Sequence, residues 1–125
     1  MKKNDLITRT HQFSVNIIHL VNQFDSSTGA YVIGKQIIRS ATSVAANYRA
    51  ACRAKSKADF IYKLKIVEEE ADESFYWLQL SDDVNIVNDK NLIRSLKNEA
   101  DELIAIFTKS LITLKKQNQL QKSDK

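Results

Sequence analysis

Residues 39–80 read RSATSVAANYRAACRAKSKADFIYKLKIVEEEADESFYWLQL, and this stretch decides the fold. It predicts the end of one long helix, a short connection and a second long helix. Ser56 and Asp59 resemble a capping box, in which a serine and an acid three residues later close the start of a helix. The helix that follows is expected over about Lys57–Asp82. Its main apolar face recurs at helical spacing and holds Phe60, Leu64, Val67, Ala71, Phe75 and Leu78.

A second apolar stripe lies almost opposite the first on this predicted helix. A surface helix of a monomer needs only one apolar face. The second face therefore predicts a contact with another protein surface, and a second copy of the chain is the simplest candidate. The expected interface between copies consists of Tyr62, Ile66, Glu69, Glu73, Tyr76, Leu80 and the adjacent Trp77.

The preceding helix is expected over about Thr28–Arg53, and its two sides contrast. Its apolar side holds Ile33, Ile37, Val44, Tyr48 and Ala51. The opposite side carries a basic stripe of Lys35, Arg39, Arg49 and Arg53, interrupted by Thr42 and Ala46. Alanine and serine crowd the middle of the segment, so we expect it to pack closely on more than one neighbour.

Two further amphipathic segments, about Asn4–Asn22 and about Lys90–Lys116, complete the pattern. The fold class predicted is all-α, as an antiparallel up-down-up-down four-helix bundle over residues 1–125 in a single domain. The alternative is a three-helix core with a loose first segment, but connections shorter than about ten residues favour the bundle. The polar tail QNQLQKSDK, residues 117–125, is expected to fray.

Composition excludes several classes of protein. The chain has two glycines and no proline, which favours long helices. It contains no apolar run of about 18 residues, so no membrane span is expected, and no apolar core follows the first two lysines, so they predict no signal peptide. Cys52 is the single cysteine, which excludes an internal disulfide and fits a reducing cytoplasm. The formal net charge of +4 permits an anionic partner without requiring one.

The sequence contains no catalytic constellation and no cofactor motif. It has no glycine-rich phosphate loop, no Ser/His/Asp set and no paired cysteines, so we expect a non-enzymatic protein without a cofactor. A metal site in a helical bundle needs inward glutamates and Glu-x-x-His pairs. Both histidines, His11 and His19, lie on the first predicted helix, and neither follows a glutamate by three residues. No metal site is therefore expected.

Several segments of the central stretch carry a family resemblance. They are SVAANYR at 43–49, AKSKADF at 54–60, KLK at 63–65, EADE at 70–73 and YWL at 76–78. The chain resembles, over roughly residues 10–118, the bacterial four-helix-bundle proteins encoded within intervening sequences of large-subunit ribosomal RNA genes. The resemblance implies a homopentamer and a suspected affinity for RNA.

Accessory proteins of diversity-generating retroelements are similar in fold and assembly, which raises a reverse transcriptase as a possible partner. One departure is Ala50, where the family often has glutamate, so any ion pair made by that acid is missing here.

The basic stripe is the candidate nucleic-acid site, because phosphates are neutralised by cations spaced along a surface. It is extended by Lys55, Lys57 and Lys63, and Tyr31 at its edge could stack on a base. Two alternatives stay open. The stripe can be a solvated face, or its arginines can pair with Glu69 and Glu73 of a neighbouring subunit. Alternatively, the protein can be a scaffold that docks another protein and touches no nucleic acid.

Overall fold

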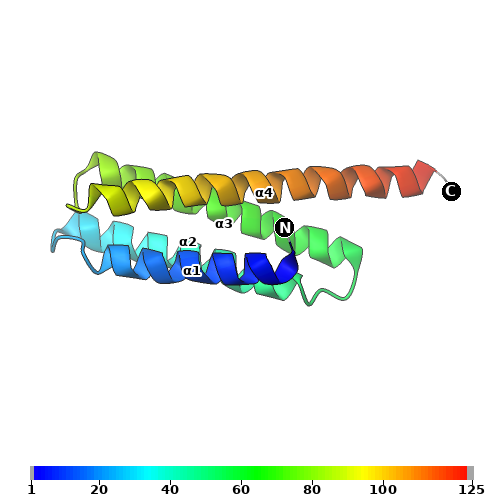
Figure 1. Cartoon of the computed structure of the whole chain (residues 1–125), viewed down its shortest axis with the longest axis horizontal. Helices are drawn as coiled ribbons and strands as arrows, with labels where there is room; N and C mark the ends of the chain where they lie inside the picture. The colour runs from blue at the N-terminus through cyan, green and yellow to red at the C-terminus, as the bar shows by residue number, and fades with distance from the viewer. Residues whose placement is uncertain (1, 124–125) are drawn as a thin grey trace.

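The computed structural model describes residues 2–123, and most of them lie in four helices. The helices are α1 (Lys3–Val21), α2 (Thr28–Ala51), α3 (Lys57–Asp83) and α4 (Lys90–Ser123). Successive helices run in opposite directions along one long axis (Figure 1). No strand occurs among the described residues. The predicted all-α bundle is confirmed, and the predicted helix ends agree within two residues except at the end of α4.

Side-chain caps fix where α3 and α4 begin. The hydroxyl of Ser56 accepts a hydrogen bond from the backbone N–H of Asp59 at 3.0 Å, which confirms the predicted start of α3. The carboxylate of Asp59 does not complete a capping box, because it accepts from Lys63 at 2.9 Å instead. At α4 the carboxylate of Asp89 accepts from the backbone N–H of Leu92 at 3.0 Å.

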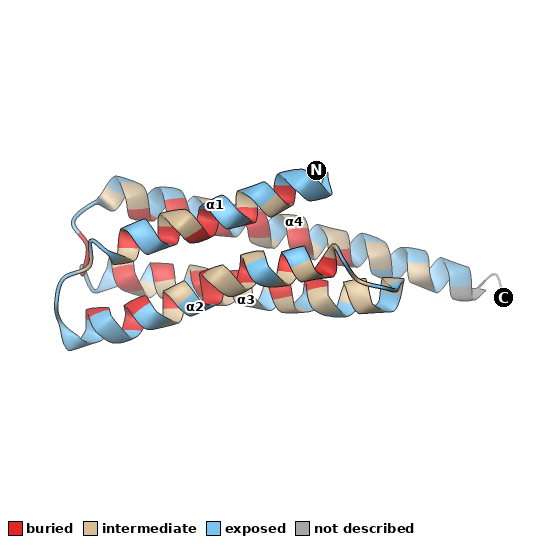
Figure 2. Cartoon of the chain, turned by 90° about the horizontal axis from the view of Figure 1, so that it is seen from below, coloured by how far each residue is buried: buried red, intermediate tan, exposed pale blue. Residues whose placement is uncertain are grey.

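Each helix buries one stripe against the other three (Figure 2). On α3 the predicted inner face is correct, with its two phenylalanines only half-buried. α1 buries its own apolar stripe in the same core, so the three-helix alternative is wrong. The largest fully buried apolar side chains are Phe13, Ile17, Leu20, Ile37, Val44, Leu64, Val67, Leu78, Ile93, Leu103 and Phe107.

Small residues let α2 pack closely on both α1 and α3, as predicted. Towards α1, the hydroxyl of Ser14 donates to the carbonyl oxygen of Ala41 at 3.0 Å. Towards α3, the buried hydroxyls of Ser74 and Ser40 are hydrogen-bonded at 2.9 Å. Such contacts between hydroxyls and a neighbouring helix satisfy polar groups that would otherwise be costly to bury.

The end of α4 differs from the prediction. The tail 117–125 was expected to fray from about residue 117, yet α4 continues to Ser123, and residues 124–125 lie outside the described range. Figure 1 shows this part of α4 extending past the other helices. The segment contains neither glycine nor proline and is rich in glutamine and lysine, which are good helix formers. Polarity alone therefore did not end the helix.

The connection between α3 and α4 is held by charged contacts. The ammonium of Lys90 lies 3.1 Å from a carboxylate oxygen of Asp82, and the ammonium of Lys97 lies 3.5 Å from the other. Lys90 also donates to the side-chain oxygen of Asn85 at 2.8 Å, a residue with a left-handed φ of 57°. The hydrogen bond from Lys90 is the main cause that holds the pKa of Asp82 below its ordinary value, while partial burial opposes it.

We expect Asp82→Asn to lower the free energy of unfolding at pH 7 but not in acid. A carboxyl whose pKa is lower in the folded chain stabilises the fold above its unfolded pKa of about 3.9. That stabilisation is lost as the pH falls through the folded pKa. Urea unfolding of both proteins across a pH series checks this. Asp83→Asn, an exposed neighbour with the same charge change, is the control. A wild-type advantage that stayed constant into acid would contradict the ion-pair account.

Candidate nucleic-acid interface

Three segments meet at one end of the bundle (Figure 1): the start of α1, the connection from α2 to α3 and the later part of α4. We call residues 2–6, 48–64 and 107–121 the basic end. Its only carboxylates among these described residues are Asp5 and Asp59. Its cations are Lys2, Lys3, Arg49, Arg53, Lys55, Lys57, Lys63, Lys109, Lys115 and Lys116.

Most of these cations have no carboxylate partner among the residues that the structure describes. Within the basic end, the one ion pair found among the described side chains joins Lys63 to Asp59. Arg49, Arg53 and Lys55 are exposed, and Lys57 is half-buried. Cations that are exposed and unpaired can neutralise a phosphate without first breaking an internal ion pair.

The opposite end of the bundle is less basic. Residues 20–34 and 78–93 contain the carboxylates of Asp25, Asp82, Asp83 and Asp89 and the cation Lys90, while Lys35 and Arg94 directly follow these ranges and Lys97 reaches Asp82. The excess of cations is therefore concentrated at one end of the long axis, although the formal net charge is only +4. A polyanion approaching in solution is attracted most strongly to that end.

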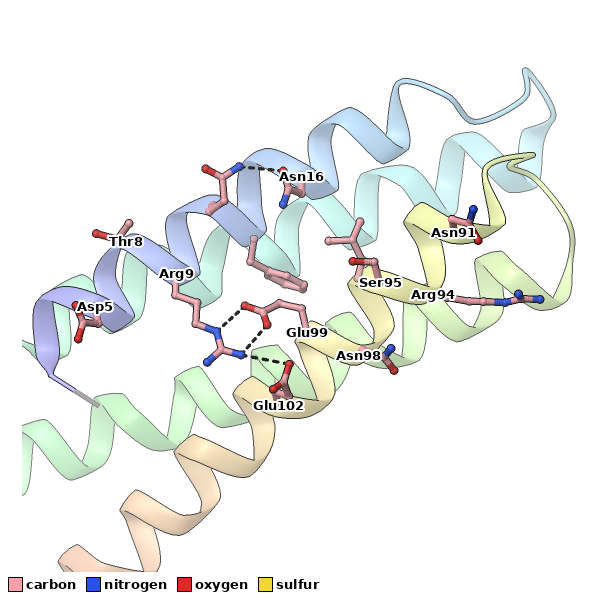
Figure 3. A pocket seen from close by; sticks show the side chains of 13 residues that line it. Asp5, Thr8, Arg9, Asn16, Asn91, Arg94, Ser95, Asn98, Glu99 and Glu102 are labelled. Carbon is pink, nitrogen blue, oxygen red and sulfur yellow. Dashed lines mark hydrogen bonds and ion pairs between the residues drawn. The ribbon is translucent and has the colours of Figure 1, made fainter.

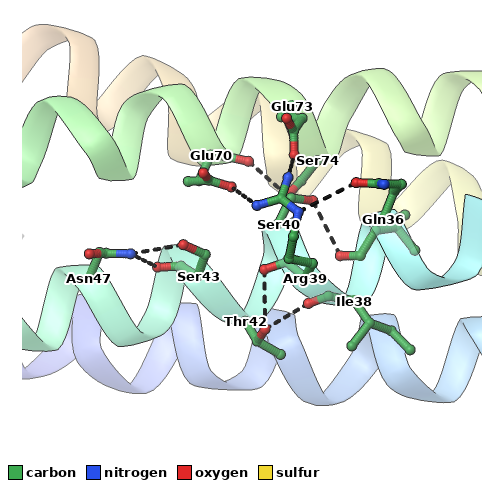
Figure 4. A network of polar contacts seen from close by, with 11 residues as sticks. Gln36, Ile38, Arg39, Ser40, Thr42, Ser43, Asn47, Glu70, Glu73 and Ser74 are labelled. Carbon is green, nitrogen blue, oxygen red and sulfur yellow. Dashed lines mark hydrogen bonds and ion pairs between the residues drawn. The ribbon is translucent and has the colours of Figure 1, made fainter.

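Two residues of the predicted basic stripe lie apart from the basic end. Arg39 forms ion pairs with two carboxylates of α3 in the same chain. Its guanidinium lies 3.1 Å from a carboxylate oxygen of Glu70 and also contacts the carboxylate of Glu73 (Figure 4). Lys35 is exposed near the start of α2, and its ammonium sits 5.4 Å from the centre of the Tyr31 ring. The stripe is thus divided, and only Arg49, Arg53 and their neighbours in the connection stay together.

The predicted pairing with an arginine is found for Glu73, and the pairing of Glu69 with an arginine of a second copy stays a prediction. Glu73 does pair with Arg39, but both belong to the same chain. The second carboxylate on that arginine is Glu70, whereas Glu69 is exposed and has no ion pair among the residues whose side chains are described. One residue along a helix is a rotation of about 100°, which is enough to turn Glu69 to solvent.

The sequence reasoning missed the cations that α1 and α4 bring to the basic end. They are Lys2, Lys3, Lys109, Lys115 and Lys116, all exposed. The signal was available in the predicted topology, because antiparallel helices bring the start of the first, the end of the second, the start of the third and the end of the fourth together. The pattern of one helix taken alone does not show this convergence of cations.

The second apolar stripe of α3, which we call the outer stripe, is not covered by the other helices of the same chain. Tyr62 is 65% exposed and Tyr76 is 56% exposed. Trp77 and Leu80 are half-buried, because they pack against a small cluster that includes Ile33 near the start of α2. The part of the predicted interface that a single chain leaves open is therefore centred on the two tyrosines.

A second apolar surface lies on the other flank of α2. It is a groove of about 640 Å³ between α1 and α2. Ile7, Val15 and Ile18 line it from α1, and Ala45 and Ala46 line it from α2. Ile18 is 38% exposed. Short alanine side chains leave room there for another apolar element to approach closely.

A groove of about 870 Å³ lies between α1 and α4 and is polar (Figure 3). Arg9 donates two hydrogen bonds of 2.7 Å to the carboxylate of Glu99 and lies 3.4 Å from Glu102. The bonds to Glu99 are the main cause of a raised pKa of Arg9. With its charge already matched, this arginine ties α1 to α4 and is a poor anion site.

The described residues offer little for metal chemistry or membrane insertion. No group of three His, Cys, Asp or Glu side chains among them is placed to hold a metal ion. None of the described helices combines the length and the apolar character needed to cross a membrane.

Comparisons with known proteins agree with this architecture. The family model for the 23S rRNA-intervening sequence protein matches residues 2–109. A crystal structure of a protein with unknown function, from the S23 ribosomal protein family of Bacteroides thetaiotaomicron, is similar with a TM-score of 0.79. It shares 34% identity, and the match covers 89% of this chain and 98% of that chain. No curated protein matches the sequence.

Proposed function

Because this chain belongs to the 23S rRNA-intervening sequence protein family, we propose that it is a non-enzymatic, cytoplasmic homo-oligomer that binds RNA through its basic end. The observation that carries the proposal is the convergence of unpaired cations from three separate segments at that end. Cations of this kind supply most of the affinity of proteins for a phosphate backbone.

Oligomerisation supports the proposal, because an oligomer carries several copies of a basic end that binds RNA weakly on its own. One basic end offers few phosphate contacts, but several held in one assembly bind a long polyanion with much higher avidity. The outer stripe of α3 and the groove between α1 and α2 are two unlike apolar surfaces on either flank of α2. A contact between unlike surfaces builds a ring when its rotation closes. The family resemblance favours five copies in that ring.

The rival function is a scaffold that docks another protein, with a reverse transcriptase as one candidate. The exposed rings of Tyr62 and Tyr76 favour it, because aromatic side chains are enriched at protein interfaces. The two functions differ in their response to salt. Binding through phosphates weakens steeply as salt rises, while docking through an apolar surface is nearly insensitive to salt.

We expect Lys55→Glu with Lys57→Glu to weaken RNA binding and flatten its salt dependence. Removing one lysine–phosphate interaction should reduce the slope of log affinity against log salt by about 0.7 for a single strand and about 0.9 for a duplex. Fluorescence anisotropy with a structured RNA over a salt series measures both the affinity and the slope.

The matched control is Lys35→Glu with Arg94→Glu, which makes the same charge change at exposed positions outside the basic end. The control should retain most of the affinity and the slope. Equal losses in the two double variants would mean that only net charge matters. Absence of binding by the wild type at low salt would remove the RNA proposal in favour of the scaffold.

A further inference from the structure

The basic end contains a groove with an apolar floor. Its volume is about 650 Å³, which is in the range of small-ligand pockets. Tyr48, Leu64 and Phe107 form the floor and are at most 3% exposed. Phe60 and Leu114 are half-buried in the walls. All four helices contribute to this groove, so its shape depends on the folded bundle.

The mouth of the groove combines an exposed aromatic face with cations and neutral polar groups. The ammonium of Lys3 lies 5.4 Å from the centre of the Phe60 ring. Lys109 lines the opposite side on α4, and Ser110, Thr113 and Gln117 supply neutral polar atoms. None of the described residues that line the groove is a carboxylate.

We propose that this groove binds one unpaired base of a single-stranded RNA, stacked on Phe60, with Lys3 and Lys109 on the adjoining phosphates; the proposal rests on RNA binding at the basic end. The base replaces the Lys3 ammonium on the aromatic face, and the displaced ammonium pairs with the phosphate of the same nucleotide. Thr113 and Gln117 supply side-chain polar atoms for the edge of the base, and the Ser110 hydroxyl, which donates to the carbonyl oxygen of Ile106 at 2.8 Å, can still accept a hydrogen bond from it.

Charge and polarity decide between a base and other occupants. A purely apolar ligand would leave the surrounding lysines and the polar rim without partners. A duplex keeps its bases stacked and paired, so it cannot fill the groove. Unpaired bases in loops and ends are the parts of RNA that proteins commonly stack on aromatic side chains. The groove therefore predicts a preference for single-stranded over double-stranded RNA.

The test uses a single-stranded RNA carrying the fluorescent base 2-aminopurine, and a duplex of the same length. Phe60→Leu keeps an apolar side chain but removes the stacking face. We expect the wild type to quench the fluorescence and Phe60→Leu not to do so. The affinity of Phe60→Leu for the single strand should fall by about fivefold or more, from the typical value of one stacked base, with little change for the duplex.

A second pair of variants tests the groove even if Phe60→Leu fails to fold. Thr113→Glu places a carboxylate at the mouth, whereas Ile112→Glu makes the same charge change one residue earlier, outside the groove. Both positions are exposed, so neither should unfold the bundle. Only Thr113→Glu should abolish the quenching.

Three results would overturn the proposal. If wild type and Phe60→Leu bind the single strand equally well and neither quenches, while Lys55→Glu with Lys57→Glu still weakens binding, the groove proposal fails and RNA binding stands. If the wild type binds no RNA at low salt, both proposals fail. If vesicles of phosphatidylglycerol and phosphatidylcholine bind the wild type more tightly than RNA and Phe60→Leu removes that binding, the groove takes a lipid.

Discussion

Phe107→Ala is expected to lower the free energy of unfolding by about 3–5 kcal/mol, as large-to-small changes of a buried phenylalanine do. Phe107 is 0% exposed, and its ring centre lies 5.7 Å from that of Tyr48. This contact joins α4 to α2 across the core, so truncation to alanine removes the packing between them. Urea unfolding at several protein concentrations measures the effect and separates it from assembly.

Ile112→Ala is the matched control on the same helix. Ile112 is 50% exposed, so its truncation should change the free energy of unfolding much less. A loss at Phe107 no larger than the loss at Ile112 would contradict the core described for α4. If both variants lost unfolding free energy at high protein concentration but not at low concentration, both residues would lie in an interface between copies instead.

Tyr76→Glu is expected to dissociate the oligomer while leaving the helices folded. The ring of Tyr76 is 56% exposed and packs edge-on against Trp77, with ring centres 5.1 Å apart. In the proposed assembly this surface is covered by a second copy, and glutamate would bury an unpaired charge there. A penalty of about 3–5 kcal/mol for such a charge corresponds to a rise of roughly 10²–10⁴-fold in the dissociation constant.

Sedimentation of wild type and variant at micromolar concentration measures this change, with circular dichroism to confirm that the helices persist. Ile112→Glu again serves as the control, because it makes the same substitution on the outer face of α4 and outside both proposed contact surfaces. A wild type that sediments at 14.3 kDa would remove the assembly proposal. Equal dissociation by both variants would place the contact elsewhere.

The sequence alone determined the four helices, their starts and their inner faces. Helix formation depends on hydrogen bonds between residues four apart and on apolar spacing along one segment, so the information is local. The Ser56 cap, the inner face of α3 and the close packing of α2 followed from that information, and the structure confirms each of them. The same reasoning misplaced the end of α4, because a polar tail without glycine or proline still continues a helix.

Only the tertiary structure decided which charges meet. Arg39 pairs with Glu70 and Glu73 and leaves Glu69 to solvent, because the register and rotation of α3 against α2 select which carboxylates face the arginine. The basic end likewise combines residues 2–6, 48–64 and 107–121, which are far apart in the chain. Net charge and the periodicity of one helix do not show such convergence, and only the topology of all four helices together implies it. It arises only when antiparallel packing brings the two ends of each helix to opposite ends of the bundle.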